Sequence, residues 1–156
     1  MRSLKYPYKV NRMKHPAYFE TDEKTSKRMS KVKLKRGDAE KRIAKLLWHK
    51  GYRYRLNYKG LPGSPDIAIQ RYKIAVFIDG EFWHGKDWEK RKSRLKRNRD
   101  YWIEKIEENI ARDSIVDKKL KAAGWIPIRF WSKEALNNAE ECIRAIDEYV
   151  FENEIL

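Results

Sequence analysis

The sequence is poor in the residues that stabilise small secreted or zinc-binding proteins. Its 156 residues include one cysteine and three histidines. A single cysteine cannot form an internal disulfide, and so few Cys and His side chains argue against a structural zinc cluster. Cys142 falls within a helical apolar pattern, so we expect it to be a buried small hydrophobic residue.

Long apolar runs are also missing. No stretch approaches the roughly 18 apolar residues that a membrane span requires. The first eight residues, Met1–Tyr8, are basic and aromatic and lack the apolar region of a secretory signal. We therefore expect no membrane partner and a cytoplasmic, nucleoid-associated location in a prokaryotic or viral setting.

Acidic residues are in the minority. The chain has 37 Lys and Arg against 23 Asp and Glu, for a formal net charge of +14. Such an excess makes a polyanion the default partner. A charged fraction of 38% would also suit the ion-paired surface of a thermophile protein, but that surface needs both signs. The charge favours nucleic acid without separating an enzyme from a binding module.

The apolar fraction of 41% is sufficient for one globular domain. Residues 1–36 are basic with little apolar periodicity, which predicts an arm that is either ordered by DNA or a disordered tail. Residues 37–156 form the predicted domain. Within it we expect helix, three strands, helix, strand, helix, hence an α/β fold. The expected helices cover 38–50, 100–123 and 133–149, and the expected strands 52–56, 66–69, 73–78 and 125–130.

Chemistry-bearing residues gather after two of these strands. Asp66 opens a strand directly after Pro65, where a carboxylate oxygen would suit Mg²⁺, although a lone Pro-Asp pair is usually a turn. The next strand ends in Asp79, Gly80, Glu81, Phe82, Trp83 and His84. A hairpin would bring Asp66 close to this end. His84 suits a general base that activates water, or it is an ordinary surface histidine.

Glu40 lies on the core-facing side of the first expected helix, where an unpaired carboxylate would be costly. It could interact favourably with the helix dipole in the first turn, or it could belong to a metal site. The residues alone leave both interpretations open.

Several segments together resemble one family. They are Leu61–Asp66 and Phe77–Gly85, with Ser26–Met29, Asp38–Leu47, Tyr101–Asp113 and Leu120–Trp131. In these segments the chain resembles the Vsr DNA mismatch endonucleases, relatives of the PD-(D/E)xK nucleases. The resemblance implies a restriction-endonuclease-like core with a mixed central sheet flanked by helices.

The resemblance also implies roles. Asp66 matches the metal-ligand aspartate, His84 the catalytic histidine and Glu40 the glutamate that supports it. Phe82, Trp83 and Trp102 match aromatics that wedge between base pairs beside a mismatch.

Two departures from the family matter. Zinc-bearing members have a cysteine where this chain has Glu81 and another near the position of Lys133. They also have a histidine and a cysteine near the positions of Lys86 and Trp88. Because this chain lacks these zinc ligands, we expect no structural zinc. The threonine of the second strand is Ile78, whose backbone carbonyl would hold the metal, with Asp79 as a further ligand.

The implied activity is that of a Mg²⁺-dependent endodeoxyribonuclease, with Mn²⁺ as a substitute. It would nick one strand of double-stranded DNA at T:G mismatches in very short patch repair, acting as a monomer. The expected phosphate contacts are Lys27, Arg28, Lys31, Lys90, Arg91, Arg94 and Arg97.

Three alternatives stay open. A sister group, the Vsr-like homing endonucleases, would cut matched duplex with the set Glu40, Asp66, His84 and Asp113, as a restriction-type enzyme also could. Asp113 could equally be a plain salt-bridging helix residue. The chain could also be a non-catalytic DNA-binding domain, or could bind unpaired RNA bases through its aromatics.

Overall fold

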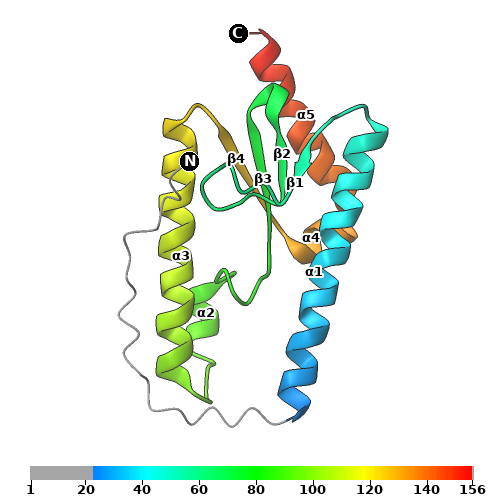
Figure 1. Ribbon diagram of the computed structural model, residues 1–156. Coiled ribbons are helices and arrows are strands. Elements are labelled where there is room, and N and C mark those ends of the chain that lie inside the picture. The colour runs from blue at the N-terminus through cyan, green and yellow to red at the C-terminus, as the bar shows by residue number, and fades with distance from the viewer. Residues whose placement is uncertain (1–22, 156) are drawn as a thin grey trace.

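The computed structural model describes residues 23–155, and for residues 23, 25–36 and 155 it describes the backbone alone. A four-stranded sheet in the order β1-β2-β3-β4 forms the centre. β1 and β2 pair antiparallel, as do β2 and β3, whereas β3 and β4 pair parallel. The predicted mixed sheet flanked by helices is therefore confirmed (Figure 1). The elements are α1 (Glu23–His49), β1 (Arg55–Leu56), β2 (Ile67–Ile69), the short 3-10 helix η1 (Gln70–Tyr72), β3 (Ile74–Asp79), α2 (Trp88–Lys92), α3 (Arg99–Ala122), β4 (Ile126–Trp131), α4 (Ser132–Asn137) and α5 (Ala139–Ile155).

Helices cover both faces of the sheet. In Figure 1, α3 lies on one side of the strands, and α1 and α5 lie on the other. The larger core cluster joins α1, α4 and α5 to the sheet through residues such as Ile43, Val76 and Ile146, and it includes Cys142, which is buried as expected. The smaller cluster joins the opposite face to α3 through Phe77 and Val116. No described helix is long and apolar enough to cross a membrane.

Alternation along β3 decides which side chains face α3. Ile74, Val76 and Ile78 belong to the larger cluster, whereas Ala75 and Phe77 belong to the smaller one. Successive side chains of a strand point to opposite faces, so Asp79 follows Ala75 and Phe77 onto the α3 face.

Three expected boundaries were wrong. The first helix begins at Glu23, not Asp38, because the lysines, arginines and leucine before Gly37 are good helix formers even without an apolar stripe. Residues 1–22 of the predicted arm lie outside the described residues. β1 has two residues rather than five, since β2 has only three residues for it to pair with. The last helix is two helices, because Asn138 leaves the helical conformation and its carbonyl accepts the first amides of α5.

Glu81 fastens the loop that follows β3 to the start of α4. Its carboxylate accepts one hydrogen bond from Ser132 Oγ at 2.8 Å and one from the Lys133 backbone amide at 2.7 Å. Burial raises the pKa of Glu81, but the hydrogen bonds from Lys133, from its own amide and from Ser132 outweigh burial, so the pKa lies below its ordinary value of 4.5. The charged carboxylate therefore stabilises the fold.

Replacing Glu81 should loosen this connection in a pH-dependent way. We expect Glu81→Ala to lower the free energy of unfolding at pH 7 by about 1 kcal/mol, similar to the loss of a side chain that caps a helix N-terminus. Because the pKa of Glu81 is depressed in the folded state, its contribution is present above pH 4.5 and is lost as the pH falls below that value. Urea unfolding at pH 7 and pH 3 measures the difference.

The control is Glu152→Ala, which removes the same charge from an exposed position on α5. Equal losses for the two variants, or a loss that does not shrink at low pH, would contradict the role given to Glu81.

Candidate active site

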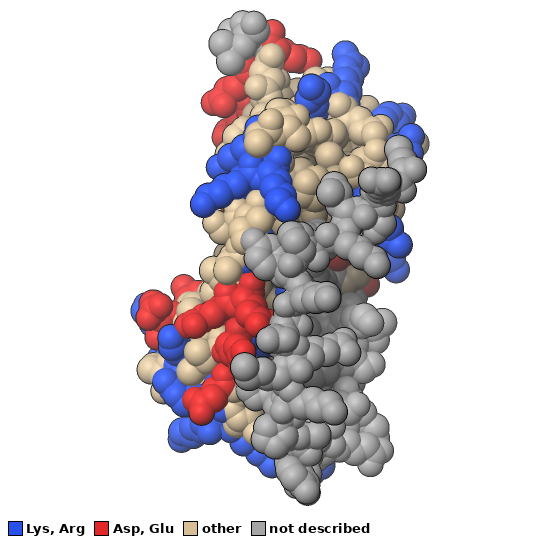
Figure 2. Space-filling view, turned by 60° about the vertical axis from the view of Figure 1, so that its left-hand side comes forward, with Lys and Arg blue, Asp and Glu red and all other residues tan. Residues whose placement is uncertain are grey.

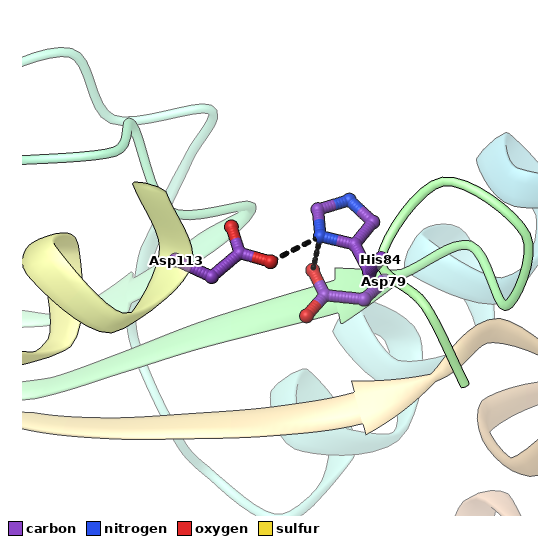
Figure 3. Close-up of side chains that lie close together, drawn as sticks. All are labelled: Asp79, His84 and Asp113. Carbon is purple, nitrogen blue, oxygen red and sulfur yellow. Dashed lines mark hydrogen bonds and ion pairs between the residues drawn. The ribbon is translucent and has the colours of Figure 1, made fainter. Parts of the chain in front are cut away.

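Three side chains that are far apart in the sequence meet at the end of β3. His84 Nδ1 lies 2.5 Å from Asp113 Oδ2 and 3.7 Å from Asp79 Oδ1 (Figure 3). Asp79 ends β3, His84 lies in the following loop, and Asp113 comes from α3. The second ring nitrogen, Nε2, points away from both carboxylates in Figure 3 and has no hydrogen-bond partner among the described residues. The His84 ring is therefore held through Nδ1, and Nε2 is left available for another partner.

A glycine next to His84 allows the loop to pass close to α3. Gly85 has a φ of +71°, and a Cβ there would lie 2.5 Å from Ile110 Cδ1. Any larger residue would be strained by the backbone conformation and would also crowd the Ile110 side chain. Lys86 Nζ, one residue later, lies 5.8 Å from the centre of the Trp131 ring.

Arg129 on β4 binds the acids of the site together. Its guanidinium donates to Asp117 from Nε at 2.9 Å and from Nη2 at 2.8 Å, and to Asp79 from Nη1 at 3.0 Å. Its carbon Cζ also lies 4.2 Å from the centre of the Phe77 ring. Burial lowers the pKa of Arg129, but the bonds to Asp117 and the charges of Asp79 and Asp113 outweigh burial and raise it. Arg129 therefore stays charged, and its guanidinium is already bonded to Asp117 and Asp79.

These residues line one cavity of about 500 Å³. Asp79, Asp113 and Asp117 carry three negative charges when ionised, and Arg129 carries one positive charge. These four residues together therefore have an excess of two negative charges. The ligand atoms of Asp79, His84 and Asp113 lie within 4.8 Å of one another, a spacing at which they could hold a metal ion. The cavity wall consists of Asp79, His84, Ile110, Asp113, Ser114, Asp117, Lys118, Lys121, Arg129, Phe130 and Trp131.

Asp66 lies on the neighbouring strand end. Its Oδ2 accepts a hydrogen bond of 2.7 Å from the Ile78 backbone amide. The hairpin thus brings Asp66 to the end of β3, as the sequence predicted. By strand alternation Asp66 shares the α3-facing side with Asp79, although it is not part of the cavity wall.

Glu40 is half-buried on α1, beside the buried Ala39. α1 packs on the face of the sheet opposite α3, and the carboxylates that the structure brings to His84 Nδ1 are Asp79 and Asp113. The support of His84 by Glu40 therefore remains a prediction, whereas Asp113 is a direct partner.

The three aromatics singled out in the sequence form one cluster. Phe82 and Trp83 follow β3, and Trp102 lies in the first turn of α3. Their ring centroids are 5.2 to 5.5 Å apart in edge-to-face arrangements, and Tyr101 joins them at 5.2 Å from Trp102. All are partly exposed. Phe82 and Trp83 directly precede His84 in the chain.

Four of the predicted phosphate-binding residues are not part of the cavity wall. Lys90 and Arg91 are on α2, and Arg94 and Arg97 follow it, with all but the half-buried Arg91 exposed. Lys27, Arg28 and Lys31 belong to α1, and their side chains lie outside the described residues. Figure 2 shows acidic side chains among the basic ones on the face it presents, so the positive excess is not one unbroken surface there.

Sequence reasoning missed Arg129, Asp117, Lys118 and Lys121. Arg129 could have been found, because it is the charged residue between Ile128 and Phe130 in an apolar strand, and alternation turns it to the other face. Asp117 follows Asp113 by four residues and so shares its helix face.

Comparison with known proteins identifies relatives. The family model described as DNA mismatch endonuclease Vsr matches residues 18–90. A type II nicking enzyme of Neisseria meningitidis serogroup C is 46% identical over 83% of this chain and 88% of its own length. A type II nicking enzyme of Haemophilus parainfluenzae is 50% identical over 70% and 78%. The DNA mismatch endonuclease Vsr of Escherichia coli K12 is 33% identical over 68% and 67%.

The identities to these relatives extend over more than two thirds of the chain. The mixed four-stranded sheet with flanking helices is consistent with this family. The chain belongs to the Vsr family of DNA endonucleases.

Proposed function

We propose that the protein is a metal-dependent nicking endonuclease that hydrolyses one strand of duplex DNA at a mismatch, with His84 as the general base. The observation that carries this proposal is the contact between His84 Nδ1 and Asp113 in the wall of a cavity, with Nε2 left without a partner among the described residues. The relatives named as nicking enzymes support a cut in one strand.

Asp113 decides which nitrogen of His84 does the chemistry. A carboxylate 2.5 Å from Nδ1 accepts a hydrogen bond from Nδ1–H, which leaves the lone pair on Nε2. Nε2 then takes a proton from water as the water oxygen attacks phosphorus and the bond from phosphorus to the leaving sugar oxygen breaks. The positive charge that forms on the imidazole is stabilised by Asp113 and Asp79. The same arrangement of acid, histidine and attacking oxygen serves hydrolysis in unrelated enzymes.

The residues present fit a magnesium ion better than a zinc ion. The donors at the ends of β2 and β3 are oxygens, namely the Asp66 carboxylate, the Ile78 backbone carbonyl and the Asp79 carboxylate, and oxygen ligands suit Mg²⁺ or Mn²⁺. A bound divalent cation would polarise the scissile phosphate and stabilise the charge of the transition state. His84 is less suited to be a ligand, because Nδ1 is already bonded to Asp113.

The cluster of Phe82, Trp83 and Trp102 supports a preference for mismatched DNA. Its partly exposed rings stand beside the loop that holds His84. Inserting an aromatic side chain between base pairs costs less free energy where the stacking is already weakened, as at a T:G pair. The second candidate is cleavage of matched duplex by the same residues.

Substitutions at the histidine and its partner should separate catalysis from DNA binding. We expect His84→Ala to lower the single-turnover nicking rate by about 10²- to 10⁴-fold, the usual contribution of a general base. Asp113→Asn should lower it at least about tenfold, because an amide no longer fixes the tautomer. Asp100→Asn, on an exposed turn of the same helix, is the matched control. Activity retained in His84→Ala would refute the assignment.

Metal dependence and substrate choice can be tested in one assay. We expect wild type to nick a T:G duplex with Mg²⁺ or Mn²⁺, to stop in EDTA and to act more slowly on the matched duplex. Asp66→Ala should bind DNA without nicking it with either ion. Equal rates on the two duplexes would favour the second candidate, and nicking in EDTA would rule out the metal.

A further inference from the structure

Two lysines line the cavity without taking part in the site described so far. Lys118 and Lys121 are exposed on α3, and both belong to the cavity wall that includes His84. Residues three apart on a helix are neighbours on one face. Among the residues whose side chains the structure describes, neither ammonium group has a hydrogen-bond or ion-pair partner. They are thus two unneutralised cations on the wall of an otherwise acidic cavity.

The third cation of the cavity is not available to a ligand. Arg129 already donates to Asp117 and Asp79, and its Nη1 lies 3.6 Å from Asp113 Oδ1. A polyanion that enters the cavity would therefore meet Lys118 and Lys121 as its free positive partners. The basic residues of α2 and the following loop are not part of this wall.

The spacing along α3 matches a nucleic-acid strand. At 1.5 Å per residue, Lys118 lies about 7.5 Å and Lys121 about 12 Å beyond Asp113 along the helix axis. One DNA strand advances about 3.4 Å along the duplex axis per nucleotide, so 12 Å corresponds to about three to four nucleotides. Flexible lysine side chains can adjust to phosphates over this range.

We propose that Lys118 and Lys121 bind backbone phosphates of the cut strand, within about four nucleotides of the scissile phosphate. The cut strand then runs along α3, with His84 and Asp113 at the scissile phosphate and the two lysines at its neighbours. This placement rests on the proposed function, because it puts the scissile phosphate at His84. The contacts are to phosphate alone, so they position the strand without reading its bases.

Salt dependence of binding tests the proposal without requiring cleavage. Affinity for a T:G duplex and a matched duplex would be measured in EDTA between 50 and 200 mM salt for Lys118→Ala, Lys121→Ala and Lys119→Ala. Each phosphate contact contributes about 0.9 to the slope of log affinity against log salt. When the salt is raised from 50 to 200 mM, the affinity of each of Lys118→Ala and Lys121→Ala should fall by a factor about three times smaller than the affinity of wild type. This difference should be the same on both duplexes.

Lys119→Ala is the matched control, because it removes the same charge from an exposed position that is not part of the cavity wall. It should keep the slope of wild type. A slope unchanged in Lys118→Ala and Lys121→Ala, or lowered equally in all three variants, would overturn the proposal.

Protection of the lysines from acylation shows whether they bind a DNA strand or any phosphate anion. It also tests the lysine contacts separately from the proposed nuclease activity. Amine acylation of wild type, read by mass spectrometry, should be slowed at Lys118 and Lys121 by duplex DNA in EDTA, but not by inorganic phosphate at the same phosphate concentration. Protection without nicking would support the strand contact and refute the nuclease. Nicking without protection would refute the contact alone, and equal protection by inorganic phosphate would reduce it to a general anion site.

Discussion

Arg129 is the residue on which the arrangement of the site depends. It reaches from β4 to Asp79 on β3 and, with two nitrogens, to Asp117 on α3. These bonds fasten the helix to the sheet at the height where Asp113 meets His84. A half-buried guanidinium with carboxylate partners is costly to leave unpaired, so removing either side would leave an uncompensated charge. The same ion pairs keep Arg129 from competing for a phosphate.

Because side chains alternate along β3, its two faces carry different kinds of residue. One face of β3 presents Val76 and Ile78 to the core beneath α1 and α5, and the other presents Phe77 and Asp79 to α3. The apolar side provides most of the burial, and the polar side carries acids that would otherwise be expensive to bury. Asp79 is 4% exposed and is tolerated there because Arg129 and His84 lie against it. Stability and chemistry thus occupy opposite faces of one strand.

Loop geometry joins the aromatics to the histidine. Glu81, Phe82, Trp83 and His84 are consecutive, so the hydrogen bonds of Glu81 to α4 restrain all of them at once. Asn109 Nδ2 also donates to the Trp83 backbone carbonyl at 3.0 Å, which ties the loop to α3. Under the proposed function, this restraint would keep the stacking aromatics Phe82 and Trp83 and the general base His84 in a fixed relation.

The sequence by itself determined the α/β class and the order of the four strands and the longer helices, because apolar periodicity and breaks at Gly and Pro are local properties. It did not show α2 or the break between α4 and α5. It also placed Asp66 at the end of β3, since a short hairpin leaves few registers. It did not decide between a salt-bridging and a site role for Asp113, which lies 29 residues from His84. Only the packing of α3 on the sheet settled that contact and assembled Arg129, Asp117 and the two cavity lysines around it. Such contacts depend on the rotation and height of a helix over a sheet, which are set by the side chains of both partners together and by neither sequence segment alone.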